Sequence, residues 1–254
     1  RLCESYYKYM TLTKTLIKRD FNQRAEYYHN NSKLQKNIAE DLYLLAKEYI
    51  KPNSKILDLG AGSGAIAHYI PNKLHHNITL LDNAKPMLDI AKKQFPNCKT
   101  LLADFNDLNE HKQKYDIIFA NMSLHWSLNI HETLKQITNL LTINGIIFIS
   151  LPSNASFKEI KEINLHLSTK LQINPLISPL DFAQNTILTK FYQQDFNSLL
   201  ELLHHFKLSG TGYKAKHSKA LTKADYRYLT TIDNKIKQLS WEIIFVRVGS
   251  SPTG

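Results

Sequence analysis

The chain has few cysteines: its 254 residues contain only Cys3 and Cys98, which lie far apart in the sequence. Two distant thiols provide neither a disulfide framework nor a cluster of metal ligands. We therefore expect no metal site, and we expect the protein in the reducing cytoplasm. No apolar run is long enough to cross a bilayer, and no signal peptide is visible, so no membrane association is expected.

Acidic residues are scarce relative to basic ones. The chain has 22 Asp and Glu residues against 32 Lys and Arg residues, which gives a net charge of +10. A basic protein attracts nucleic acid, an acidic carrier protein or an anionic substrate, although a gene composition that favours Lys explains the charge equally well. Because the lysines are scattered and no nucleic-acid module is visible, nucleic acid is not an expected partner.

Glycine is also rare, yet three of the eight glycines lie at alternate positions in one stretch. Gly60, Gly62 and Gly64 follow the apolar run 55–59, and residues 65–70 are expected to begin a helix. Without a Cβ, glycine lets a ligand approach the backbone, and the free N–H groups of a helix start can bind that ligand. The alternative is a glycine-rich turn that binds nothing.

Short apolar segments alternate with helical segments through the first part of the chain. The strands expected here are residues 55–59, 78–82, 100–104, 115–121 and 146–150. This alternation predicts an α/β protein with a parallel sheet that helices cover on both faces. Ligands bind at the carboxyl ends of such strands. The polar residues at those ends, where we expect a site, are Asp58, Asp82, Asp104 and Asn121.

The rest of the chain is expected to complete one domain, 1–254. Its parts are a helical cap (1–50), a cofactor-binding core (51–150), a helical lid insertion (151–184) and a C-terminal, substrate-side part of the sheet (185–248). A sixth strand is expected at 186–192, and a last strand at 241–248 on the edge of the sheet. Asp195 is expected to cap one late helix, and Thr222 or Asp225 another.

Two features of the core fit any adenosine cofactor. The glycine loop satisfies the loose dinucleotide pattern, and Asp82 follows Asp58 by 24 positions, near the roughly 20 expected for a carboxylate that binds ribose hydroxyls. A nicotinamide enzyme fits both features. S-adenosylmethionine is favoured because Asp58 precedes Gly60 by two residues, because Asp104 can accept a hydrogen bond from an adenine amine, and because a long helical segment precedes the first strand.

The core resembles the class I S-adenosylmethionine-dependent methyltransferases. The matching motifs, in order, are Asp58-x-Gly60-x-Gly62-x-Gly64, Asp82, Ala103-Asp104 and Tyr115-Asp116-x-Ile118. The flanks resemble one family of that class, the malonyl-[acyl-carrier protein] O-methyltransferases of biotin synthesis. The matching segments are Phe21-Asn22-x-Arg24-Ala25-x-x-Tyr28, Leu34-Gln35, Asn121-Met122-Ser123-Leu124-His125-Trp126, and Lys207 with Gly210 in a late helix and turn.

This resemblance implies a Rossmann-like sheet of seven strands, with the last strand antiparallel at or near the edge and a helical lid after strand five. It implies S-adenosyl-L-methionine as cofactor, and methylation of the free carboxylate of a malonyl group on an acyl carrier protein. Arg24 and Lys207 become candidates to hold that carboxylate, and His125 and Trp126 lie on the substrate side. The cofactor-binding candidates are Tyr28, Gln35, Asp58, Gly60, Ala61, Gly62, Gly64, Asp82, Asn83, Met87, Asp104, Phe105, Asn121 and Ser123.

Other functions remain open at this point. A quinone-type methyltransferase would methylate carbon and need a base such as His125, whereas a carboxylate is already ionised at pH 7 and needs none. The segments Ser123-Leu124-His125-Trp126 and Ile177-Ser178-Pro179 also resemble a mitochondrial complex I assembly factor that hydroxylates an arginine. A cofactor-binding regulator without turnover is a further alternative.

Overall fold

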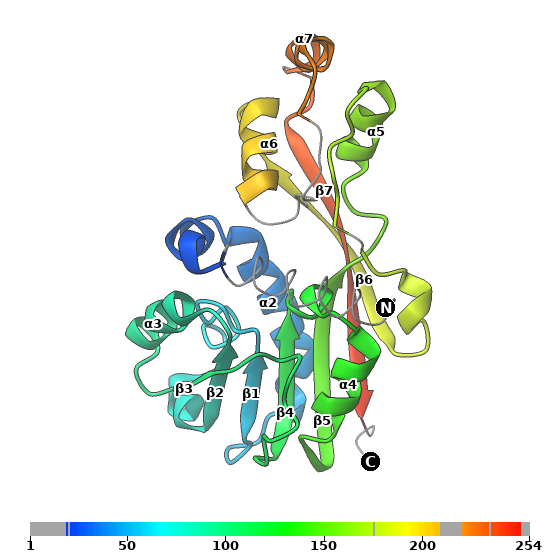
Figure 1. The fold of residues 1–254 in the computed structure, drawn as a ribbon. Coiled ribbons are helices and arrows are strands. Elements are labelled where there is room, and N and C mark those ends of the chain that lie inside the picture. The colour runs from blue at the N-terminus through cyan, green and yellow to red at the C-terminus, as the bar shows by residue number, and fades with distance from the viewer. Residues whose placement is uncertain (1–18, 20, 175, 209–219, 234, 250–254) are drawn as a thin grey trace, which may run out of the picture. The chain divides into compact units, whose positions relative to one another are not determined.

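The computed structural model describes residues 19, 21–174, 176–208, 220–233 and 235–249 (Figure 1). Cys3 and Gly210 lie outside the described residues. The chain divides into two compact units. The core unit contains Arg1–Leu151, Phe182–Leu188 and Phe245–Gly254, and the second unit contains Pro152–Asp181 and Thr189–Ile244. The division into one domain with a cap, core, lid and substrate-side part stays a prediction.

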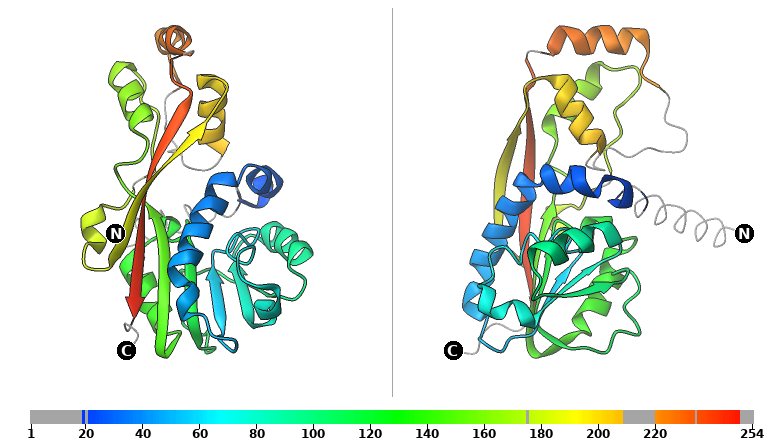
Figure 2. Two further views of the ribbon diagram at one scale, coloured as in Figure 1. Left: turned by 180° about the vertical axis from the view of Figure 1, so that it is seen from behind. Right: turned by 90° about the vertical axis from the view of Figure 1, so that its left-hand side faces the viewer.

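The described strands form a seven-stranded sheet in the order β3-β2-β1-β4-β5-β7-β6 (Figure 1). The strands are β1 Ile56–Leu59, β2 Ile78–Asp82, β3 Lys99–Leu102, β4 Tyr115–Asn121, β5 Leu141–Pro152, β6 Thr186–Asp195 and β7 Gln238–Gly249. Strands β1 to β5 pair in parallel, whereas β7 runs opposite to β5 (Figure 2). These features confirm the predicted Rossmann-like α/β sheet.

The last strand lies near the edge of the sheet but does not form it. Strand β7 lies between β5 and β6, so the prediction that it forms the edge is wrong. Its middle is apolar and fully buried, including Ile243, Ile244 and Phe245, whereas most side chains of β6 are exposed. The apolar strand takes the inner position because burial of its side chains needs neighbours on both sides.

The helices of the described chain are short. They are α2 Lys33–Ala46, α3 Lys85–Gln94, α4 Ile130–Thr138, α5 Lys158–His166, α6 Leu199–Leu208 and α7 Lys223–Ile232, with the 3₁₀ turns η1 Lys47–Tyr49, η2 Asn72–Asn77, η3 Leu124–Trp126 and η4 Pro179–Phe182. Residues 21–30 are also helical and are called the cap helix below. Within the described ranges, no helix is both long and apolar enough to cross a membrane.

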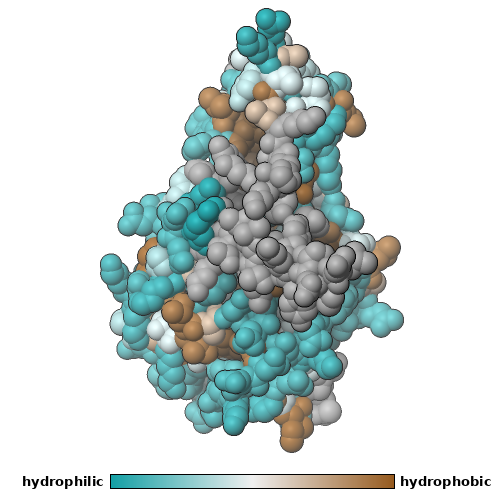
Figure 3. Space-filling view, viewed as in Figure 1, coloured by the Kyte–Doolittle hydropathy of each residue, from teal (hydrophilic) through white to brown (hydrophobic). Residues whose placement is uncertain are grey.

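Apolar spacing explains how the helices dock. In α2, buried Leu34, Ile38, Leu42 and Ala46 recur every four residues, which places them on one face. In α3, Met87, Leu88 and Ala91 are buried in the same way. On the face of the molecule seen in Figure 3, exposed hydrophobic residues occur in small groups among many hydrophilic ones, as on an ordinary protein surface.

The helix predicted after the glycine loop does not form. Residues 62–69 make a series of turns, in which Gly64 N donates to Ala61 O and Tyr69 N donates to Ile66 O. These two bonds span three residues, and only the bond from His68 N to Gly64 O spans four, so the segment is not a regular α-helix. Gly62 and Gly64 both have positive φ, which also disfavours a helix start there. The N–H groups of Ala61 and Gly62 donate instead to Leu81 O and Asp82 Oδ2 at the end of β2.

Of the two predicted helix caps, one is wrong and one is confirmed. Ser198, not Asp195, caps α6, because Glu201 N donates to Ser198 Oγ at 3.1 Å. Asp195 ends β6, where it accepts a hydrogen bond from Gln238 Nε2. At α7, Thr222 and Asp225 form a reciprocal capping box, so both predicted residues take part in the same cap.

A buried thiol follows α3. Cys98 is free and fully buried between α3 and β3. Burial raises the pKa of its thiol to about 11, so the side chain is neutral in the folded protein. The Lys92 ammonium donates to the backbone oxygens of Pro96 and Cys98, which fixes this turn.

Candidate active site

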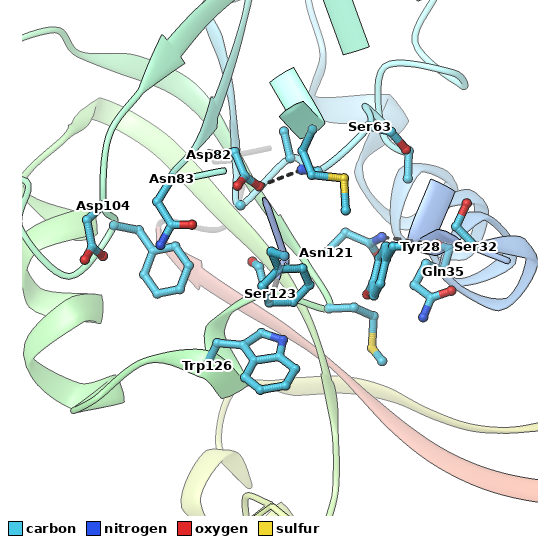
Figure 4. Close-up of a pocket in the computed structure, with 18 of the residues that line it drawn as sticks. Tyr28, Ser32, Gln35, Ser63, Asp82, Asn83, Asp104, Asn121, Ser123 and Trp126 are labelled. Carbon is cyan, nitrogen blue, oxygen red and sulfur yellow. Dashed lines mark hydrogen bonds between the residues drawn. The ribbon is translucent and has the colours of Figure 1, made fainter. Parts of the chain in front are cut away.

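A pocket opens in the core unit at the carboxyl ends of β1, β2 and β4 (Figure 4). It contains about 900 Å³ of space, part of which is open to solvent. Most of the predicted site residues line it: Tyr28, Gln35, Gly60, Ala61, Gly62, Asp82, Asn83, Met87, Asp104, Phe105, Asn121, Ser123 and Trp126. The lining also includes residues that were not among the predicted site residues: Phe21, Ser32, Ser63, Ala65, Asn106 and Met122.

Gly60 is the tightest point of the glycine loop. Its φ is +67°, and a Cβ at this position would lie 2.5 Å from Ser123 Cβ. Ser123 Oγ in turn donates to Leu59 O at 2.7 Å, which holds the turn after β4 against the end of β1. Gly62 differs, because a Cβ there would meet nothing within 4 Å. Only glycine therefore fits at Gly60, for reasons of both space and backbone conformation.

Asp82 ties the end of β2 to the glycine loop. Its Oδ2 accepts a hydrogen bond from Gly62 N at 2.8 Å (Figure 4). Its Oδ1 accepts one from Ala84 N at 2.8 Å. Burial raises the pKa of this carboxyl group, although the backbone N–H groups of Ala84, Gly62 and Asn83 act in the opposite direction. A carboxylate has about four acceptor positions, so Asp82 can still accept from the hydroxyls of a ligand.

Asp104 organises the loop after β3. Its Oδ1 accepts from both the backbone N and the side-chain Nδ2 of Asn106, each at 2.8 Å. Asn106 Oδ1 then accepts from Leu128 N at 3.0 Å, which joins this loop to the segment after η3. In Figure 4, Asp104 lies on the side of the pocket opposite Tyr28 and Gln35.

A strained residue follows β4. Met122 has a φ of +50°, which is unfavourable for a residue with a side chain, and it lines the pocket. Ser150, fully buried in β5, holds it there: Met122 N donates to Ser150 O and to Ser150 Oγ. Ser150 Oγ donates to Asn121 Oδ1, and Asn121 Nδ2 donates to Gln35 O in α2. The strain is thus maintained by a buried hydrogen-bond network.

We expect the S150A variant to lose about tenfold in turnover, because removal of the buried hydroxyl breaks its hydrogen bonds with Met122 N and Asn121 Oδ1, and the resulting shift of Met122 costs roughly 1–1.5 kcal/mol. Cofactor affinity should change less, because Ser150 itself does not line the pocket and Asn121 keeps its hydrogen bond to Gln35 O. The measurement is turnover together with calorimetric binding of S-adenosylhomocysteine. S156A is the matched control, because Ser156 is an equally buried serine of the second unit that bonds the backbone of Glu242. Equal turnover in both variants would contradict the expectation.

Aromatic side chains form one wall of the pocket. The Phe21 ring makes edge contacts with Tyr28 and with Trp126, each at 5.5 Å between centroids. Ala25 of the cap helix packs against Ala84 and Met87. Burial raises the pKa of Tyr28 to about 12, so its phenol stays neutral. The cap helix therefore contributes aromatic and apolar contacts to the wall of the pocket.

Two cofactor candidates lie outside the pocket lining. Asp58 is buried, and its Oδ2 has no hydrogen-bond partner among the described residues. Burial, with a contribution from the charge of Asp82, raises its pKa to about 8. Gly64 faces α3 instead, since a Cβ there would lie 2.7 Å from the Phe95 ring. Asp58 and Gly64 are not among the lining residues, and their assignment to the cofactor site stays a prediction.

The substrate-side candidates are also separated by the structure. Trp126 lines the pocket, but its neighbour His125 and the half-buried Arg24 do not. His125 packs on Trp126 at 4.9 Å, its Nδ1 has no hydrogen-bond partner in the described chain, and burial lowers its pKa to about 3. Lys207 belongs to α6, and its side chain lies outside the described part of the structure.

The charge of the pocket fits S-adenosylmethionine. The ionisable acids and bases among its lining residues are Asp82, Asp104 and the neutral Tyr28, and none of the lysines or arginines that the structure describes lines it. An acidic pocket suits a cofactor with a positive sulfonium better than one with a pyrophosphate. The fold and the site define a Rossmann-like protein that binds an adenosine cofactor between a glycine loop and the acid after β2.

Comparison with known proteins identifies the family. The family described as a methyltransferase domain matches residues 50–202, and the chain belongs to this family. It is 29% identical over 203 residues to a malonyl-[acyl-carrier protein] O-methyltransferase of Priestia megaterium, covering 78% of this chain and 73% of the relative. A protein of the same name from Buchnera aphidicola is 28% identical over 228 residues, covering 86% and 90%. The predicted resemblance is thus confirmed.

Solved structures agree on the fold. The YcgJ protein of Bacillus subtilis has a TM-score of 0.53 with 11% identity, and a putative methyltransferase of Bacillus halodurans has 0.52 with 13% identity. Each match covers 82% of this chain and 97% of the other. The chain is a methyltransferase that uses S-adenosyl-L-methionine, as its motifs predicted.

Proposed function

We propose that this methyltransferase transfers a methyl group to the free carboxylate of a malonyl group carried by an acyl carrier protein. The observation that carries the proposal is its similarity, over most of both chains, to proteins named for that reaction. An acidic carrier protein also complements the net charge of +10. The product would be the methyl ester that begins biotin synthesis, formed in the cytoplasm.

The proposed reaction requires correct positioning of the two reactants and requires no acid or base from the protein. When bound, the cofactor supplies a methyl group already activated by its sulfonium. The acceptor carboxylate is ionised at neutral pH and needs no base. Asp82 and the glycine loop would fix one reactant, while Phe21, Met122 and Trp126 would exclude water around the other. Such alignment contributes roughly 7–11 kcal/mol to catalysis.

The group that holds the acceptor carboxylate is part of the proposal. Arg24 and Lys207 remain the cation candidates, but no cation lines the described pocket. Trp126 offers a neutral donor instead, the indole N–H, on a ring that lines the pocket. A neutral donor orients a carboxylate while withdrawing less charge from it than a cation would.

We expect W126F to raise the KM for the malonyl acceptor about tenfold, the value of one hydrogen bond to a charged group. The affinity for S-adenosylhomocysteine should stay within about twofold. The chain has two tryptophans, so W241F is the matched control. Trp241 is buried in the second unit, and its N–H has no partner in the described structure. A KM unchanged in W126F would remove Trp126 from the acceptor site.

The proposed function is tested by mass spectrometry of malonyl-[acyl-carrier protein] after incubation with the enzyme and S-adenosylmethionine. Acetyl-[acyl-carrier protein] is the control, since it lacks the free carboxylate. A gain of one methyl group on the malonyl carrier alone supports the proposal. No gain, in a preparation that still binds the cofactor, overturns the acceptor assignment and leaves the enzyme class intact.

A quinone-type carbon methylation is less well supported. It needs a base beside the reacting carbon, and His125 was the candidate. Its low pKa makes His125 a weak base, and it does not line the pocket. The arginine-hydroxylase alternative rests on the sequence resemblance of short segments.

A further inference from the structure

A buried histidine supports the turns that follow the glycine loop. His75, in η2, is only 5% exposed, and its Nε2 lies 3.1 Å from Ala67 O and 3.0 Å from Ile70 O. Carbonyl oxygens can only accept, so the ring hydrogen is on Nε2 and is shared between the two oxygens. The backbone that His75 contacts therefore defines which ring nitrogen carries the hydrogen.

Both carbonyl groups need this donor because of Pro71. In a regular helix, Ala67 O would accept from the N–H of residue 71, but proline has none. Ile70 O would accept from Leu74 N, which donates to Pro71 O instead at 2.8 Å. Ala67 and Ile70 are fully buried, so solvent does not supply the missing donors. The imidazole of His75 takes their place.

The ring of His75 also supports the glycine loop through Phe95. The two rings meet edge to face, with 5.6 Å between their centroids. Phe95, which follows α3, packs on Gly64 so closely that a Cβ on Gly64 would lie 2.7 Å from the Phe95 ring. Gly64 in turn lies between Ser63 and Ala65, which both line the pocket. A line of contacts thus joins His75 to the pocket wall.

We propose that His75 is a positioning residue for cofactor binding, which holds the turns at residues 62–69 so that the glycine loop keeps its shape. The loop depends on this support because single turns, rather than a regular helix, follow it. Without the Nε2–H donor, the turns must shift to give Ala67 O and Ile70 O new partners, and this displaces the pocket-lining part of the loop. His75 does not line the pocket, so it acts through the loop.

The test is the affinity for S-adenosylhomocysteine, measured by calorimetry well below the melting temperature of each variant. H75M replaces the imidazole with an apolar side chain of similar length that has no donor. H75Q is the conservative variant, because its amide N–H extends about as far from the backbone as Nε2–H does. H76M is the matched control, because His76 is the next residue of η2 and is exposed.

We expect H75M to lose about tenfold in affinity, comparable with the loss of one hydrogen bond, and H75Q to recover most of that loss. H76M should bind like the wild type. An H75M variant with a lower melting temperature but unchanged affinity would overturn the proposal, because His75 would then contribute to stability alone. Equal losses in H75M and H75Q would also overturn it.

A second variant covers the case in which H75M does not fold. The amide of H75N is one bond shorter than that of H75Q and does not reach the two carbonyl groups. H75N should therefore bind about tenfold more weakly than H75Q, and equal affinities would overturn the proposal. The experiment requires only cofactor binding, so its outcome is independent of the acceptor substrate.

Discussion

Replacing Gly60 with alanine is expected to lower the affinity for S-adenosylhomocysteine by more than about 100-fold, because two separate costs fall on one residue. The new Cβ would lie 2.5 Å from Ser123 Cβ, and both atoms belong to backbone segments that are held in place. The positive φ of +67° adds strain for any residue with a side chain. Relief of the steric clash or of the backbone strain would displace the end of β1 or the turn after β4, and both segments line the pocket.

G62A provides the matched comparison within the same loop. Its φ of +54° carries a similar strain, but a Cβ at this position has no neighbour within 4 Å. We therefore expect a loss of about tenfold, the part due to backbone conformation alone. Calorimetric binding of S-adenosylhomocysteine to G60A and G62A separates the effect of backbone strain from the effect of the steric clash with Ser123. Thermal unfolding of both variants verifies that they fold. Equal losses in the two variants would show that the contact with Ser123 has no role.

The second large effect is expected for D82A. This change removes the two carboxylate oxygens that accept hydrogen bonds from Gly62 N and Ala84 N. It also removes any hydrogen bonds that Asp82 makes to the cofactor. Each lost contact costs roughly 1–1.5 kcal/mol, so we expect cofactor affinity to fall about 100-fold. The glycine loop would lose its attachment to β2. D82N keeps one acceptor oxygen and should fall between D82A and the wild type.

D116A is the control for D82A. Asp116 also accepts from a backbone N–H, that of Lys55, and from Thr142 Oγ1, but it lies at the amino end of β4. We expect D116A to lower the melting temperature without changing cofactor affinity. If D82A and D116A reduce affinity equally, the effect of Asp82 is one of stability rather than of binding.

Strand ends were the part of the site that sequence predicted well. Asp82, Asp104 and Asn121 all line the pocket because parallel strands end at one edge of the sheet. Asp58, near the end of β1, is buried and is not among the lining residues, and its Oδ2 has no hydrogen-bond partner among the described residues. Its part in the cofactor site stays a prediction.

Several lining residues outside the strands could not be placed from the sequence. Phe21 belongs to a motif that was recognised, but its ring contacts depend on how the cap helix docks. Met122 gave no signal, because its positive φ results from contacts with Ser150, 28 positions away. Asn106 is fixed in the same manner by the segment after η3. Sequence spacing does not encode such long-range contacts.

The buried thiol of Cys98 allows local unfolding of the protein to be measured by alkylation. Only the thiolate form of a cysteine attacks an alkylating reagent, and this side chain is both fully buried and neutral. In a C3S variant, each molecule that reacts must first have exposed Cys98 in the connection between α3 and β3, so the rate of alkylation reports the free energy of that local opening. Met87 lines the pocket from the same helix, α3. A bound cofactor should therefore slow the alkylation of Cys98, although Cys98 does not contact the cofactor.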